Sequence, residues 1–233
     1  MPQEVHDRTP TLMARLWAAT AALREDRELL AGRVSSLDYR LYLVRMYGFH
    51  AAVERALTAF RPLATVVADA GLRNHKAALL AHDLVALGVQ RCHLAQLPRM
   101  AFPQAQALSE ALGWTYVVEA QALRGKHLAR RLARHLPAEI QRASAYLGCY
   151  GDEAATRWRE LGDAIDAFAL GRSPVPIAPA AGPSAARHIP EPGELAGVER
   201  SCERVIEAAR DGLDRLHRWL GPVRKPRANQ RHA

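Results

Sequence analysis

The feature that most constrains the fold is an apolar periodicity of three to four residues that recurs along almost the whole chain. No run of alternating β-branched residues closed by Asn-Gly or Asp-Gly predicts a hairpin. Apolar residues make up 49% of the 233 residues, which excludes a chain that is disordered as a whole and allows a sizeable core. The sequence therefore predicts an all-α domain of six to eight helices.

Prolines, glycines and capping residues mark where these helices are expected to begin and end. Thr9 is expected to cap the first helix, with Pro10 in its first turn and Gly32 at its end. The other helices are predicted over residues 35–60, 74–87 and 104–135, from Pro137 onward, and over residues 152–170 and 194–220. On the second helix, the residues expected to face inward are Leu37, Leu41, Val44 and Phe49.

Proline content and charge divide the chain further. Residues 171–194 hold six of the 14 prolines, which predicts an extended connection inside a single domain of residues 1–220. Residues 221–233 form a basic tail with four Lys or Arg and no acid, which is half of the net charge of +8. Basic residues are not interleaved with aromatic ones in the body, so we expect a solvated tail and no nucleic-acid partner.

The cysteines and the termini bear on the compartment. Three cysteines without a Cys-x-x-Cys pair exclude a disulfide framework and a cysteine zinc site. The first residues lack the apolar core of a signal peptide, and the longest uncharged run, residues 173–186, is too short and proline-rich to span a bilayer. A cytoplasmic protein with no membrane span is expected.

The common catalytic motifs are missing from the sequence. It contains no Gly-rich phosphate loop, no nucleophile elbow and no Glu-x-x-His pair, and no protein-held metal is expected. Gly113 and Gly125 interrupt a long helical pattern, and each glycine lowers helix stability by about 1 kcal/mol relative to alanine. Either a ligand approaches the backbone there or another segment packs tightly on it, and the spacing does not distinguish the two.

Five motifs occur in the order found in one known family. They are Leu16-x-x-x-Thr20-x-x-x-Arg24-x-x-x-Glu28, then Tyr39-Arg-x-x-Leu43 with Met46-Tyr-Gly-Phe49, then Leu112-Gly-x-x-Tyr116-Val-Val-Glu119-Ala-Gln-Ala-Leu-Arg-Gly125, then Tyr150-Gly151 with Trp158-Arg159, and finally Leu216-x-x-Trp219-Leu220. This ordered set covers roughly residues 10–220. It resembles heme oxygenase, in the bacterial biliverdin-producing branch of the family.

The resemblance implies a multihelical fold in which heme lies between the first helix and a glycine-kinked distal helix. Heme would be both cofactor and substrate, and it would be opened to biliverdin, carbon monoxide and iron with electrons from a ferredoxin or a reductase. By position, the resemblance assigns cofactor binding to Thr20, Arg24, Glu28, Tyr116, Ala120, Arg124 and Arg159. It assigns catalytic roles to Gln121 and Gly125.

The sequence departs from the family where contact with the ligand is expected. Arg24 stands at the position of the proximal histidine, and a guanidinium has no lone pair to offer to iron. Ala120 and Arg124 stand at two of the three distal glycine positions. Arg24 could pair with Glu28 on the helix surface or grip a tetrapyrrole propionate. His50 is a weaker candidate ligand, because it lies on a different helix.

Two functions therefore remain open. The chain could be a heme oxygenase with impaired or altered activity. Alternatively it could be a pseudoenzyme, that is, a non-catalytic protein that binds heme or a bilin or acts as a regulator. The chemistry of residue 24 favours the second function, because ordinary turnover needs an axial imidazole.

Overall fold

The computed structural model describes residues 10–21, 34–73, 75–172 and 192–221. Within these ranges there are eight α-helices, three short 3₁₀ helices and no β-strand. The helices are α1 (Leu12–Ala19), α3 (Ser36–Ala59), α4 (Ala70–Arg73), α5 (Lys76–Ala86), α6 (Leu108–Leu132), α7 (Pro137–Arg142), α8 (Ala154–Ala169) and α9 (Pro192–Leu220). The 3₁₀ helices are η2 (Arg61–Thr65), η3 (Arg91–Gln96) and η4 (Gly151–Glu153). The predicted all-α fold class is confirmed.

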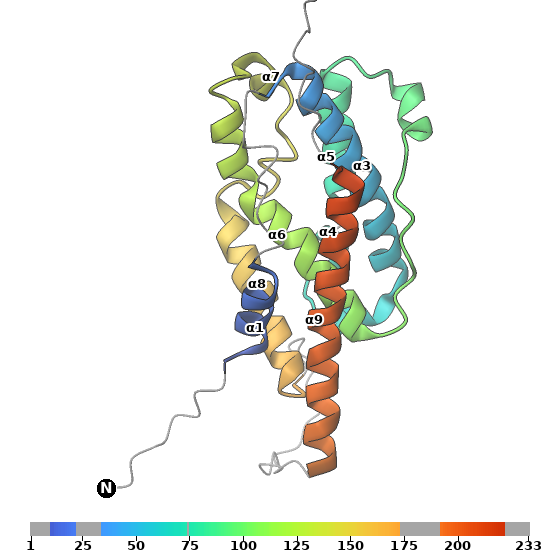
Figure 1. Cartoon of the computed structure of the whole chain (residues 1–233), viewed down its shortest axis with the longest axis vertical. Coiled ribbons are helices and arrows are strands. Elements are labelled where there is room, and N and C mark those ends of the chain that lie inside the picture. The colour runs from blue at the N-terminus through green and yellow to red at the C-terminus, as the bar shows by residue number, and fades with distance from the viewer. Residues whose placement is uncertain (1–9, 22–33, 74, 173–191, 222–233) are drawn as a thin grey trace, which may run out of the picture.

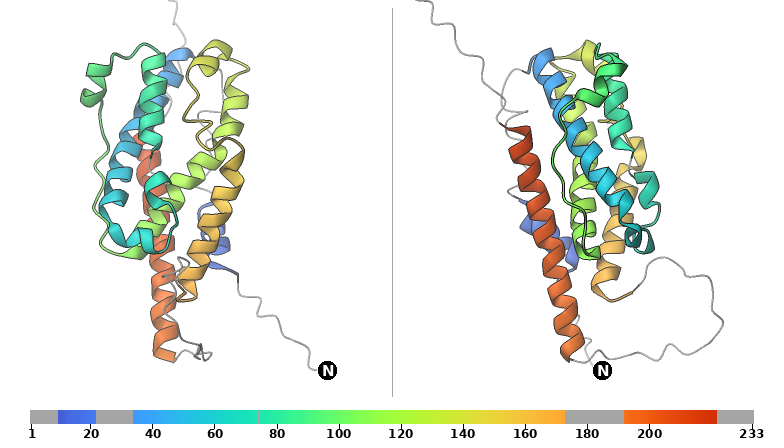
Figure 2. Two further views of the ribbon diagram at one scale, coloured as in Figure 1. Left: turned by 180° about the vertical axis from the view of Figure 1, so that it is seen from behind. Right: turned by 90° about the vertical axis from the view of Figure 1, so that its right-hand side faces the viewer.

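Helix α6 is the centre of the bundle. It crosses between the α3–α5 pair and α8, while the long α9 packs along one side (Figures 1 and 2). Gly113 of α6 lies where α9 crosses it, and a side chain at this position would meet the Val205 carbonyl oxygen at 2.6 Å. Close helix packing, rather than a ligand, therefore explains the first interior glycine.

The boundaries follow local chemistry. Ser35 and Asp38 form a capping box at the start of α3, and Gly88, with a φ of +91°, ends α5. The N-cap of α1 is Thr11 rather than Thr9, and Pro10 precedes the helix. Helix α1 is described only to Ala19, and the predicted continuation to Gly32 falls mostly outside the described residues.

One prediction about the other helices is wrong, and some boundaries differ by a few residues. Leu37 and Leu41 are 71% and 43% exposed, because α3 buries the stripe that contains Tyr39 and Leu43 instead. The predicted helix over residues 74–87 is α5, which begins at Lys76, and the short α4 that precedes it was not predicted. Helix α9 begins at Pro192, two residues earlier than predicted. In the part of the chain that is described, no helix has both the length and the apolar character that crossing a membrane requires.

Candidate functional site

The C-terminal end of α1 meets the middle of α6 through one hydroxyl pair. Thr20 Oγ1 donates to the Leu16 carbonyl and lies 2.8 Å from the Tyr116 hydroxyl. Both side chains are fully buried. We call this contact the α1–α6 junction; it brings together two of the predicted cofactor-binding residues, which are 96 positions apart in the sequence.

Three aromatic rings from three helices surround this junction. The Tyr116 and Trp158 ring centroids are 5.3 Å apart, and Trp158 makes an edge contact with Trp17 at 5.8 Å. We call Trp17, Tyr116 and Trp158 the aromatic corner. Burial decreases outward along it, from the fully buried Tyr116 through the partly buried Trp158 to Trp17, which is 45% exposed.

Contacts with two neighbouring helices fix the orientation of α1 beside this corner. The Asp166 carboxylate of α8 accepts the Met13 N–H at 2.7 Å, which satisfies one of the free amides in the first turn of α1. Arg15 donates through both terminal nitrogens to Glu199 of α9, at 2.7 and 3.2 Å. The short helix is therefore held from two sides.

The stretch of α6 beyond the junction carries the predicted distal residues. Ala120 is buried, Gln121 is partly buried, and Arg124 is partly buried with its Nη1 atom inside the protein. Gly125 lies directly against the backbone of Leu147, whose carbonyl oxygen would clash with any side chain there. The second interior glycine, like Gly113, accommodates another segment of the chain.

The remaining predicted residues lie elsewhere. Arg24 and Glu28 fall outside the described residues. Arg159 is exposed on α8 and donates to Thr156 Oγ1 at 3.2 Å. The guanidinium of Arg159 pairs with no carboxylate within the described ranges. Its neighbour Arg157, by contrast, lies 3.4 to 3.6 Å from three carboxylates, those of Asp69, Glu153 and Glu160.

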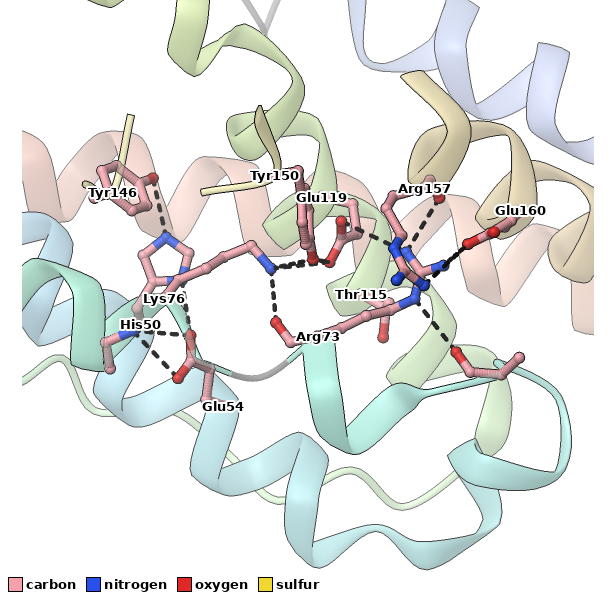
Figure 3. A network of polar contacts seen from close by, with 12 residues as sticks. His50, Glu54, Arg73, Lys76, Thr115, Glu119, Tyr146, Tyr150, Arg157 and Glu160 are labelled. Carbon is pink, nitrogen blue, oxygen red and sulfur yellow. Dashed lines mark hydrogen bonds and ion pairs between the residues drawn. The ribbon is translucent and has the colours of Figure 1, made fainter. Parts of the chain in front are cut away.

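A second group of polar residues lies toward α5, and no sequence motif predicted it. Lys76 is fully buried, and its ammonium donates to the Arg73 carbonyl at 2.7 Å, to the Tyr150 hydroxyl at 2.9 Å and to Glu119 Oε1 at 3.0 Å (Figure 3). The Tyr150 hydroxyl also donates to Glu119 Oε1, at 2.9 Å. We call Arg73, Lys76, Glu119 and Tyr150 the buried polar cluster.

The guanidinium of Arg73 closes this cluster on its outer side. It donates to the Ala68 and Arg157 carbonyls and, at 2.9 Å, to Glu160, while its Nη1 lies 3.7 Å from Glu119. The three N–H donors of the Lys76 ammonium all have acceptors. The pKa of Tyr150 is raised, first by burial of its hydroxyl and then by the negative charge of Glu119. A buried charge that is paired and fully hydrogen-bonded is the form that a protein interior tolerates.

His50 and Glu54 of α3 continue the polar contacts further inward. His50 Nε2 lies 3.1 Å from the Tyr146 hydroxyl, and Nδ1 lies 3.5 Å from Glu54 (Figure 3). Glu54 in turn accepts the Ala77 N–H at 3.1 Å, so a carboxylate from α3 caps the start of α5. This distant cap explains why α5 begins at Lys76. Burial lowers the pKa of His50, which favours the neutral imidazole.

A small surface cleft of about 180 Å³ opens above the buried polar cluster. Its lining residues are Arg73, His75, Cys149, Tyr150, Glu153 and Arg157. Burial raises the pKa of Cys149 to about 11, so its thiol stays protonated at neutral pH and is not an activated nucleophile. The cleft therefore carries no obvious catalytic group.

Sequence reasoning missed the buried polar cluster although two of its members, Glu119 and Tyr150, lie in the quoted motifs. Arg73 and Lys76 carried no signal, because each meets a carboxylate partner across more than 40 positions of sequence.

The residues present do not fit a histidine-ligated heme iron. Among the described residues, no histidine lies on α1 or between Tyr116 and Gly125 of α6. His50 is not available as a substitute, because its two ring nitrogens face Tyr146 and Glu54 inside the core. The position that the family resemblance assigns to the ligand is Arg24. The donor set for iron is therefore missing from these positions.

Comparisons with known proteins agree with the motif order. The heme oxygenase family model matches residues 20–173, which is more than half of the chain. A crystal structure of NO- and CO-bound heme oxygenase from Neisseria meningitidis matches with a TM-score of 0.64 at 18% identity, covering 96% of this chain and 99% of that chain. At that identity the structural match shows the fold. No curated protein sequence matches the chain.

Proposed function

Because the chain belongs to the heme oxygenase family, we propose that it binds a tetrapyrrole beside the α1–α6 junction without the iron–histidine bond on which the family's ring opening depends. The observation that carries the proposal is the conflict between two neighbouring positions. The Thr20 and Tyr116 hydroxyls lie 2.8 Å apart, while Arg24, four residues beyond Thr20 in the sequence, offers no lone pair to iron.

The chemistry of the site supports a ligand held by its ring and its carboxylates. A guanidinium stays protonated at physiological pH and pairs bidentately with carboxylates, which tetrapyrroles carry as propionates. Arg24 is placed by sequence to supply such a charge, and Arg159 offers another that pairs with no described carboxylate. Neither contact depends on a metal. Heme, metal-free porphyrin and a bilin such as biliverdin should therefore bind with similar affinity.

The test is a titration of the purified chain with hemin, metal-free protoporphyrin IX and biliverdin, followed by absorbance. We expect Kd values within about fivefold of one another. The variant Arg24→His should strengthen hemin binding at least tenfold, since iron gains a bond, and weaken binding of metal-free protoporphyrin, which loses the guanidinium and gains nothing in return. Arg40→His, on the exposed face of α3, is the matched control and should change neither ligand.

Turnover is measured on the same samples with ascorbate, or with a ferredoxin and its reductase. We expect no biliverdin and no released iron from the unmodified chain. A histidine-type Soret spectrum followed by biliverdin formation would overturn the proposal and establish the family's oxygenase activity in this chain. Absence of binding of all three ligands at micromolar concentration would also overturn it.

A further inference from the structure

The aromatic corner has an outer face that helix packing does not use fully. Helix α1 turns Leu12 and Leu16 into the core, and Trp17 follows next to them with 45% of its surface exposed. The other residue at this surface is Trp158, which is partly buried and lies edge-on to Trp17 at 5.8 Å. Two indoles from α1 and α8 therefore meet where they remain open to solvent.

This aromatic surface is continuous with the α1–α6 junction. Trp158 tilts onto Tyr116 at 5.3 Å, and the Tyr116 hydroxyl bonds Thr20, which lies three residues beyond Trp17. The three rings form one path from the surface to the buried hydroxyl pair. A flat ligand seated beside the junction would thus meet indole rings at its outer edge.

A ligand without an axial bond needs another source of affinity. Aromatic pairs contribute beyond the area that they bury, and large planar rings gain most from such contacts. The propionates of a tetrapyrrole lie at the rim of the ring, which leaves the conjugated face available for stacking. Indole surface is therefore the chemistry that would replace the lost iron–histidine bond.

We propose that the indole of Trp17, held edge-on by Trp158 at an interplanar angle of 68°, forms the stacking face for a planar tetrapyrrole and determines the preference of this site for conjugated rings irrespective of metal. This inference rests on the proposed function and adds the surface that supplies the affinity. Trp17 supplies most of the contact, because Trp158 is already partly covered by Tyr116 and Trp17.

The experiment compares Trp17→Ala, Trp17→Phe and Trp158→Phe with the control Trp219→Phe, using metal-free protoporphyrin IX as the probe. Trp219 is a partly buried tryptophan whose Nε1 donates to the Arg45 carbonyl at 2.6 Å, away from the corner. We expect Trp17→Ala to raise Kd about tenfold and Trp17→Phe to raise it about twofold. Trp158→Phe should raise it about threefold, and the control should stay within twofold.

Circular dichroism in the Soret region separates contact from stability. An achiral porphyrin gains its signal there by coupling to nearby aromatic rings, so Trp17→Ala should reduce the induced band per bound ligand, while the thermal midpoint stays near that of the unmodified chain. Wild-type affinity and an unchanged band in Trp17→Ala would overturn the stacking face and leave the proposed function standing. Loss of all binding in the unmodified chain would remove both.

Discussion

Two neighbouring contact regions of α6 differ in their chemistry, although Tyr116 and Glu119, which belong to them, are only three positions apart. Tyr116 faces the aromatic corner, where its hydroxyl meets that of Thr20 and its ring contacts Trp158. Glu119 faces the buried polar cluster, where a lysine, a tyrosine and an arginine surround one carboxylate. The cluster side is a closed arrangement in which each donor of Lys76 has a partner. The corner side keeps apolar surface open to solvent.

The motif residues that match the family and those that depart from it differ in their contacts. Motif residues that are kept have contacts within the fold: Tyr39 donates to the Ala143 carbonyl, Glu119 binds Lys76, and Gly125 accommodates Leu147. The positions that depart from the family, 24, 120 and 124, are those where the resemblance implies contact with the ligand. By that resemblance, the motif residues that match the family stabilise the fold, and the departures fall at the positions expected to contact the ligand.

The largest expected effect lies on the cluster side. Lys76→Met should lower the free energy of unfolding by about 3–5 kcal/mol, because it leaves Glu119 buried without its nearest cation. Urea unfolding followed by circular dichroism measures the change. Lys126→Met is the matched control, since its partner Asp152 is fully exposed, and it should leave the unfolding midpoint almost unchanged. Equal losses in the two variants would contradict the assignment of the cluster as a structural centre.

The next effect concerns the glycine that the resemblance assigns to catalysis. Gly125→Ala should destabilise the chain by about 1–3 kcal/mol, because the new methyl group would overlap the Leu147 backbone. Gly197→Ala in α9 is the control with the opposite sign. A Cβ added at Gly197 would meet no other atom within 4 Å, so alanine should stabilise the helix by up to about 1 kcal/mol. If Gly125→Ala were neutral in stability but abolished tetrapyrrole binding, this glycine would belong to the ligand site instead.

The sequence predicted the helical class and most of the long helices, because periodicity and caps are local signals. It failed for Leu37 and Leu41, where several stripes of α3 are apolar and only the tertiary fold selects the one that is buried. It also failed for the buried polar cluster, since Lys76 meets Glu119 across 43 positions and Tyr150 across 74. The resemblance assigns Thr20 and Tyr116 separately to cofactor binding, and their mutual contact was not predicted, because local periodicity does not encode tertiary contacts.

Stability should depend on pH through His50. Burial lowers the pKa of His50 below its usual value of 6.5, so the unfolded chain binds this proton more readily than the folded one. The neighbouring charges are Glu54 and Glu119, which raise the pKa, and Lys76, which lowers it. The contribution to stability is complete above pH 6.5 and is lost as the pH falls below it, by at most about 1.4 kcal/mol per pH unit.

The measurement is the unfolding free energy from pH 8 to pH 5 for the unmodified chain and for His50→Gln, which keeps a polar group opposite Tyr146. The variant should show a shallower dependence below pH 6.5, whereas the exposed His93→Gln should follow the unmodified curve. Burial raises the pKa of Asp83, so its titration changes the stability with the opposite sign. Parallel curves for His50→Gln and the unmodified chain would show that His50 is not the titrating group.

The smallest effect sharpens the comparison from the corner side. Tyr116→Phe removes one hydroxyl and should cost about 0.5–1.5 kcal/mol, the usual net contribution of a neutral hydrogen bond. Thr20→Val removes the partner, and the double variant should lose less than the sum of the two single changes, because the residues are in contact. A coupling of about 0.5 kcal/mol or more in urea unfolding would confirm that this bond ties α1 to α6.

The same double-mutant cycle, repeated with bound ligand, tests whether the α1–α6 junction contributes to ligand binding or only to the stability of the fold. If the α1–α6 junction exists to hold the two helices apart at the distance that a tetrapyrrole needs, the coupling should grow when the ligand is bound, since ligand and hydroxyl pair would then stabilise one geometry. If the coupling is unchanged by the ligand, the junction is part of the retained scaffold, like the buried polar cluster. The proposed ligand site would then lie outside Tyr116 and include Trp17 and Trp158.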